Sequence, residues 1–159
     1  MLKNGLESLA KLFASKDGQS RVIVVGCGRL GANIANTLCN EQKDITVIDK
    51  DKSSFQRLSP DFSGKVLLGE GVEFSLLREA EIRSASMMIA VTNDDNTNIL
   101  ISQMAREIFY IGQVIARISD PEKVSLCESF GINVINPIIL AKKEIESLLG
   151  ISRETGNYV

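Results

Sequence analysis

The chain has 159 residues, and its 18 Lys and Arg against 20 Asp and Glu give a formal net charge of −2. This length suits one domain of about 100–200 residues, and a near-neutral charge with 5% aromatic residues is not typical of a nucleic-acid-binding protein, which usually presents a basic face. The sequence has no histidine and three scattered cysteines (Cys27, Cys39 and Cys127), which excludes Ser-His-Asp triads and His-ligated metals and favours a reducing compartment.

Residues 1–20 are expected to form an amphipathic helix followed by a linker. One apolar stripe at helical spacing contains Leu2, Leu6, Leu9, Leu12 and Phe13. A packing face against this domain or a partner is favoured over a membrane-surface helix, because the polar face mixes both charge signs. No segment of the sequence approaches the run of about 18 apolar residues that predicts a membrane span.

Residues 21–149 show the rhythm of a single α/β domain. Short apolar runs begin near Val22, Ile45, Val66, Met87, Val114 and Ile132. They lack alternation, which is typical of parallel strands covered on both faces. Segments with helical spacing separate them, so we expect a doubly wound, Rossmann-like sheet with strand order 3-2-1-4-5-6. A further apolar helix is expected over 138–149, and residues 150–159 are expected to form a tail.

The motif that carries chemistry follows the first strand directly. Gly26-Cys-Gly-Arg-Leu-Gly31 is a G-x-G-x-x-G turn from strand to helix. In such a turn the first glycine permits the tight bend, the second lets a phosphate approach the backbone, and the third allows close helix packing. The N-terminus of the following helix attracts anions. Cys27, at an x position, is interpreted as a small packed residue and not as a nucleophile.

Asp49 supports the same interpretation from the end of the second strand. It lies 18 residues after Gly31, close to the roughly 20 residues expected for an acid that binds the ribose hydroxyls. A carboxylate here disfavours the 2′-phosphate of NADP. Arg29 is interpreted either as a phosphate contact or as a solvated surface residue. Lys50, Asp51 and Lys52 are interpreted as surface charges, although Lys50 could instead lie beside the adenosine.

Two other strand ends supply candidate contacts, because open α/β sheets bind ligands outside the carboxyl ends of their strands. Glu70 and Gly71 follow the third strand and are placed beside the adenine. Thr92 and Asn93 follow the fourth and are placed at the distal part of the ligand. The next two residues, Asp94 and Asp95, are expected to cap the following helix. Arg117, after the fifth strand, is expected to form a salt bridge or to meet a partner chain.

Five segments together resemble the TrkA N-terminal domain, of the KTN or RCK type. They are Gly26–Gly31, Asp44–Asp51, Gly69–Gly71, Val91–Asp95 and Val114–Pro121. The resemblance covers residues 21–149. Two departures lie after the third strand, where Glu70 replaces the usual Asp and Val72 stands where a hydroxyl is expected. The C-terminal ligand-binding domain of many members is missing, so the chain is expected to be a single-domain member or part of a longer protein.

The resemblance implies a nucleotide-binding regulatory subunit or domain of a potassium uptake system of the Trk or Ktr type. It implies binding of NAD(H) or an adenine nucleotide (ATP, ADP or AMP), no catalytic turnover, and a cytoplasmic position beside a membrane-embedded potassium-translocating subunit. The expected contacts are Gly26, Cys27, Gly28, Arg29, Leu30, Gly31, Asp49, Lys50, Glu70, Gly71, Thr92 and Asn93. The alternative is an NAD-dependent oxidoreductase or a fragment of one.

A homo-oligomer, either a dimer or a ring, is expected for a separate reason. The segment Ile138-Ile-Leu-Ala141 opens the last helix and is apolar nearly all round. A helix that lies on one sheet face needs only one apolar stripe. Its first turn should therefore have a second surface to bury, and in the family this helix commonly reaches a neighbouring subunit.

Overall fold

Each of the six apolar runs forms a β-strand in the computed structural model, which describes residues 20–151. The strands are β1 (Arg21–Val25), β2 (Asp44–Asp49), β3 (Lys65–Leu68), β4 (Ala85–Ala90), β5 (Gln113–Arg117) and β6 (Asn133–Ile135). The helices are α2 (Arg29–Asn40), α3 (Phe74–Glu79), α4 (Asp95–Glu107), α5 (Pro121–Ser129) and α6 (Pro137–Leu148), with the 3₁₀ helices η1 (Lys52–Arg57) and η2 (Ile82–Ser84). The expected N-terminal helix and nearly all of the expected tail lie outside the described residues.

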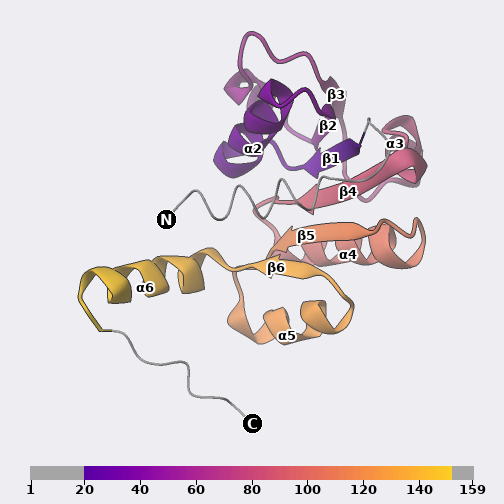
Figure 1. The fold of residues 1–159 in the computed structure, drawn as a ribbon. Helices are drawn as coiled ribbons and strands as arrows, with labels where there is room; N and C mark the ends of the chain where they lie inside the picture. The colour runs from indigo at the N-terminus through magenta and orange to yellow at the C-terminus, as the bar shows by residue number, and fades with distance from the viewer. Residues whose placement is uncertain (1–19, 152–159) are drawn as a thin grey trace.

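The strands form one parallel sheet in the order β3-β2-β1-β4-β5-β6 (Figure 1), which confirms the predicted topology. In register, Val25 at the end of β1 stands beside Ile48 of β2 and Ala90 of β4. The chain runs outward from β1 to β3 and then returns to continue from β4. The carboxyl ends of β1 and β4 therefore flank the point where the strand order reverses, and ligands bind at such points in this class of sheet.

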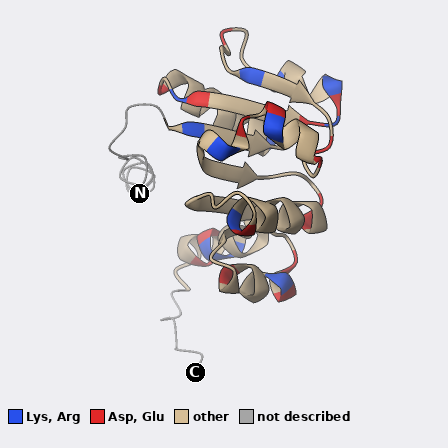
Figure 2. Ribbon diagram, turned by 90° about the vertical axis from the view of Figure 1, so that its right-hand side faces the viewer, with Lys and Arg blue, Asp and Glu red and all other residues tan. Residues whose placement is uncertain are grey.

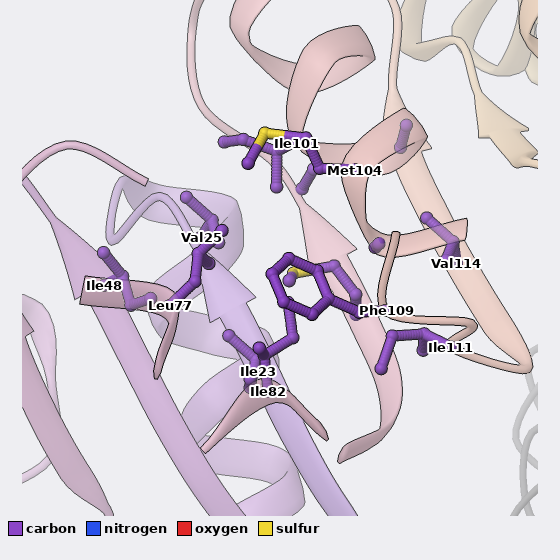
Figure 3. Packing of buried hydrophobic residues seen from close by; sticks show 14 of the residues in the cluster. Ile23, Val25, Ile48, Leu77, Ile82, Ile101, Met104, Phe109, Ile111 and Val114 are labelled. Carbon is purple, nitrogen blue, oxygen red and sulfur yellow. The ribbon is translucent and has the colours of Figure 1, made fainter. Parts of the chain in front are cut away.

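Two separate hydrophobic cores explain why the strands show no alternation in sequence. Ile23 and Val25 pack into the core beneath α3, α4 and α5, whereas Val22 and Val24 pack into the core beneath α2 and η1. Figure 3 shows the first of these cores, where Ile23 and Ile82 lie near the ring of Phe109. Residues Val22 to Val25 of β1 are thus apolar on both faces of the strand because both faces are covered.

Helix α6 contacts little of the described structure. Figure 1 shows it extending away from the sheet after β6, and none of its residues is buried. Ile138, Leu140 and Ile145 are 61%, 52% and 56% exposed. Asn136 caps the helix by accepting a hydrogen bond from the N–H of Ile139 at 2.9 Å. Among residues 20–151, no helix combines the length and the apolar character needed to cross a membrane.

Candidate functional site

A cleft of about 420 Å³ lies at the carboxyl ends of β1 to β4. Its walls come from the glycine loop, the end of β2 with η1, and the loops after β3 and β4. Most of the predicted contact residues line it: Gly26, Gly28, Asp49, Lys50, Glu70, Gly71, Thr92 and Asn93. The remaining predicted contacts, Cys27, Arg29, Leu30 and Gly31, belong to the glycine loop and the start of α2 but are not part of the lining.

The three glycines of the loop differ in the space around them. A Cβ on Gly26, whose φ is +103°, would lie 2.7 Å from the backbone nitrogen of Thr92, and a Cβ on Gly31 would lie 1.8 Å from the carbonyl oxygen of Gly26. A Cβ on Gly28 would meet no atom within 4 Å. Gly26 and Gly31 are thus required by backbone packing, whereas Gly28 keeps the cleft open where a phosphate would approach.

Helix α2 begins at this loop, and no side chain of the described residues caps its first amides. Gly28 is the N-cap residue, and the first intrahelical bond runs from the N–H of Ala32 to the Gly28 carbonyl at 2.9 Å. The preceding N–H groups of a helix have no intrahelical partner and lie at the positive end of its dipole. The side chains of Arg29 and Leu30 are exposed on the first turn.

Asp49 is tied to the glycine loop by its own carboxylate. The N–H of Cys27 donates to Oδ2 at 2.6 Å, and the N–H of Asp51 donates to Oδ1 at 2.8 Å. Each oxygen can accept a further hydrogen bond. The residue therefore braces the loop and still has acceptor capacity for ribose hydroxyls, and the bond to Cys27 could not be read from the motif.

Cys27 contributes its backbone and not its thiol. The side chain is fully buried, and Sγ donates to the carbonyl of Ser54 at 3.5 Å. Burial, reinforced by the nearby charge of Asp49 and partly opposed by Arg57, raises the thiol pKa to about 11. A thiol in this state remains protonated near neutral pH and is a poor nucleophile, as the sequence-based interpretation expected.

The expected adenine side of the cleft is bordered by an ion pair. Lys50 Nζ lies 3.6 Å from Glu70 Oε1, and both side chains are largely exposed. This bond joins the end of β2 to the end of β3 across the mouth of the cleft. Gly71 has a packing role as well, because a Cβ there would lie 2.4 Å from Cγ1 of Val25.

The loop after β4 confirms one of the two expected helix caps. Asp94 accepts a hydrogen bond from the N–H of Thr97 at 2.6 Å, and this bonding lowers its pKa below the ordinary value. The expectation for Asp95 was wrong. Its carboxylate accepts from the N–H groups of Ser119 and Asp120, both at 2.9 Å, and so holds the loop between β5 and α5. Propensity alone cannot separate these roles, since either residue could precede the helix.

Arg117 forms no salt bridge among the described residues. Its Nη1 donates to Oδ1 of Asn93 at 3.1 Å, so it joins the ends of β5 and β4. Of the two expectations for Arg117, the salt bridge is not formed, and contact with a partner chain stays a prediction.

Several residues that line the cleft were not predicted from the sequence to do so. The interpretation of Asp51 as a surface charge was incomplete, because it lines the cleft and caps η1 by accepting from the N–H of Ser53 at 2.8 Å. Ser54 and Arg57 line the cleft from the same 3₁₀ helix, and Thr97 lines it from α4. The Asp51-x-Ser53 pattern is a local turn signal, but a short 3₁₀ helix has no periodic signature that would place its side chains in a site.

Charges in and around the cleft are mixed. Asp49, Asp51, Glu70 and Asp94 face only Lys50 and Arg57 among its lining residues. In the view of Figure 2, Lys and Arg are interspersed with Asp and Glu. Within residues 20–151, no group of three or more cysteine and acidic side chains is placed to hold a metal ion.

Comparison with known sequences gives one consistent result. The model of the TrkA-N domain matches residues 22–137. The Trk system potassium uptake protein TrkA of Streptomyces coelicolor is 38% identical over 114 residues, which cover 72% of this chain and 51% of that protein. The TrkA homolog of Methanothermobacter thermautotrophicus is 31% identical over 129 residues, 80% of this chain and 59% of that protein. The chain thus spans little more than half the length of these relatives.

Solved structures similar to this chain include a channel. The GsuK channel bound to NAD shares 26% identity and a TM-score of 0.72, over 90% of this chain and 25% of that chain. The structure of GsuK bound to ADP shares 26% identity and a TM-score of 0.69, over 82% of this chain and 34% of that chain.

Proposed function

This chain belongs to the TrkA-N domain family, and we propose that it is the nucleotide-binding regulatory subunit or domain of a potassium uptake system of the Trk or Ktr type. The observation that carries the proposal is one cleft lined by both Gly28 of the glycine loop and Asp49, at the strand-order reversal. The chain would act by binding, without catalytic turnover, on the cytoplasmic side of a membrane-embedded potassium-translocating subunit.

The proposed ligand is NAD(H) or an adenine nucleotide, as in the NAD-bound and ADP-bound GsuK structures. In this assignment Asp49 accepts from the ribose hydroxyls, and the amides at the start of α2 bind the phosphates. Lys50 and Glu70 border the adenine, and Thr92 meets the distal part of the ligand. Binding would bias one of two arrangements of the uptake system, because a ligand shifts such an equilibrium by its differential affinity for the two states.

A calorimetric titration of the purified chain with NADH, NAD, ATP, ADP and AMP tests the proposal directly. We expect saturable binding of at least one of these ligands at one site per chain. Guanosine monophosphate provides a comparison, because it keeps the ribose and phosphate and changes only the base. Absence of binding by all five adenine-containing ligands would contradict the proposed function.

Arg29 is expected to distinguish longer ligands from AMP. It stands on the first turn of α2 next to Gly28, outside the cleft lining, so only phosphates beyond the first would come within its reach. Arg29→Ala should weaken binding of ATP or NADH by about tenfold, as expected for loss of a charged hydrogen bond, with a smaller effect on AMP. Arg83→Ala, an exposed arginine near the amino end of β4, is the control. Equal losses for all three ligands would reassign Arg29 to a structural or interface role.

We also propose that the chain forms a homodimer or larger ring partly through α6. The helix buries none of its residues within the described chain, although Ile138, Leu140 and Ile145 are apolar, and exposed apolar patches of this kind commonly mark interfaces. Light scattering at micromolar concentration should give at least twice the monomer mass of 17.4 kDa. Ile145→Lys should lower that mass, whereas Leu126→Lys, at an exposed leucine of α5, should not. A strict monomer with and without nucleotide would contradict this proposal.

A further inference from the structure

Asn98 is a fully buried polar residue that no part of the nucleotide-binding motif includes. It lies on α4 with 0% exposure. Its Oδ1 accepts hydrogen bonds from the backbone N–H of Thr92 at 3.0 Å and from the Thr92 hydroxyl at 2.7 Å. Its Nδ2 donates to the carbonyls of Thr92 at 3.1 Å and Arg117 at 2.8 Å. Both donors and both acceptor positions of the amide are therefore used.

These four hydrogen bonds connect the ends of β4 and β5 beyond the last backbone pairing between the two strands. The ladder between β4 and β5 ends at the pair Ala90 and Ala116. Thr92 and Arg117 lie just past or at the ends of these strands, and the Asn98 amide bridges them. Thr92 in turn abuts the glycine loop, since its backbone nitrogen is the atom that a Cβ on Gly26 would approach at 2.7 Å. Asn98 thus helps to hold Thr92 against the loop, together with the bond from the N–H of Val91 to the carbonyl of Val25 at 2.8 Å.

The bonding also determines what Thr92 can offer a ligand. Its hydroxyl is within 2.7 Å of Asn98 Oδ1 and 3.2 Å of the Asp94 carbonyl, so its single proton is directed to the protein in either case. The hydroxyl oxygen already accepts from the N–H of Asp94 at 3.2 Å, so one acceptor position remains toward the cleft. Asp94, two residues after Thr92, also lines the cleft and carries a carboxylate. At this end of the cleft, Thr92 and Asp94 thus present acceptors, which favour a neutral group that donates hydrogen bonds over a terminal phosphate.

We propose that Asn98 is a positioning residue that fixes Thr92 as a hydrogen-bond acceptor and thereby makes the distal end of the cleft selective for the second nucleoside of NADH, which is uncharged, over the terminal phosphates of ATP. The proposal rests on the proposed nucleotide-binding function. It concerns only the part of the ligand beyond the first phosphates, because Asn98 does not touch the walls formed by β2, η1 and β3. Its effect must therefore depend on ligand length.

The test is calorimetric titration of the full chain with AMP, NADH and metal-free ATP. The unmodified chain should bind NADH at least about tenfold more tightly than ATP. Asn98→Ala should weaken NADH binding by about tenfold, a factor within the range of one or two lost hydrogen bonds, and should change AMP binding by less than about threefold. Asn96→Ala is the matched control, since this asparagine of α4 is exposed and its Oδ1 accepts a hydrogen bond from Lys123 Nζ at 3.1 Å.

A second variant separates positioning from a merely structural role. Thr92→Val removes the hydroxyl acceptor and should reproduce the selective loss of NADH binding. The double variant Thr92→Val with Asn98→Ala should lose little more than either change alone, because both act through one group. If Asn98→Ala does not fold, as judged by thermal unfolding, Asn98→Ser with Thr92→Val provides the same comparison.

The outcomes distinguish this inference from the proposed function. If the unmodified chain binds none of the five adenine-containing ligands, the nucleotide-binding function itself fails and the inference falls with it. If ATP binds but NADH does not, only the inference fails. If AMP and NADH both bind, the inference is overturned by any of three results. These are ATP binding as tight as NADH binding, equal losses of AMP and NADH binding in Asn98→Ala, or fully additive losses in the double variant.

Discussion

In the Gly28→Val variant we expect nucleotide binding to fall below detection while the domain remains folded. A Cβ at Gly28 meets no atom within 4 Å, and the residue lines the cleft at the start of α2. Its φ of −71° is one that any residue adopts. The valine side chain would therefore occupy the space through which a phosphate approaches the helix amides, without disturbing the packing around it.

The measurement is calorimetric titration, with thermal unfolding to verify the fold. Gly112→Val is a matched control, because a Cβ at Gly112 also meets nothing within 4 Å and this loop lies before β5, away from the cleft. We expect Gly112→Val to bind nucleotide as the unmodified chain does. Near-native affinity in Gly28→Val would mean that the phosphate is not held by this loop.

For Asp49→Ala we expect a loss of about ten- to a hundredfold in affinity for every ribose-bearing ligand. Hydrogen bonds to a charged group contribute about 1.5–3 kcal/mol, and a tenfold change in affinity corresponds to about 1.4 kcal/mol. The structure adds a second effect, because the N–H groups of Cys27 and Asp51 both lose their acceptor. The melting temperature should fall as well, and affinities are best compared well below it.

Asp44→Ala is the control for this second variant. Asp44 lies at the opposite end of the same strand, where its carboxylate accepts from Arg21 Nε at 2.7 Å. Its removal should lower stability slightly and leave nucleotide affinity unchanged. Unchanged affinity in Asp49→Ala would rule out the ribose assignment, whereas loss of affinity in both variants would indicate a general effect on the fold.

The strand pattern and the glycine loop were predictable because local sequence and topology determine them. Short apolar runs without alternation require a sheet covered on both faces, and right-handed crossovers then restrict the strand order. The G-x-G-x-x-G spacing likewise carries its own geometry: Gly26 and Gly31 leave no room for a Cβ, and Gly28 does. The helix starts at Asp120 and Asn136 follow from local capping in the same way.

Only the tertiary structure decided which polar groups meet across the sheet. Asp49 bonds to the N–H of Cys27, and Asp95 to the loop before α5, through residues more than 20 positions away. Asn98 likewise reaches the carbonyl of Arg117 from the next strand. Such bonds depend on how strand ends are brought together, so residue type and spacing cannot assign them. The exposure of α6 was also decided by the tertiary structure. The apolar residues of this helix predict that it is buried. Whether this chain itself supplies the surface that buries the helix depends on where the helix leaves the sheet.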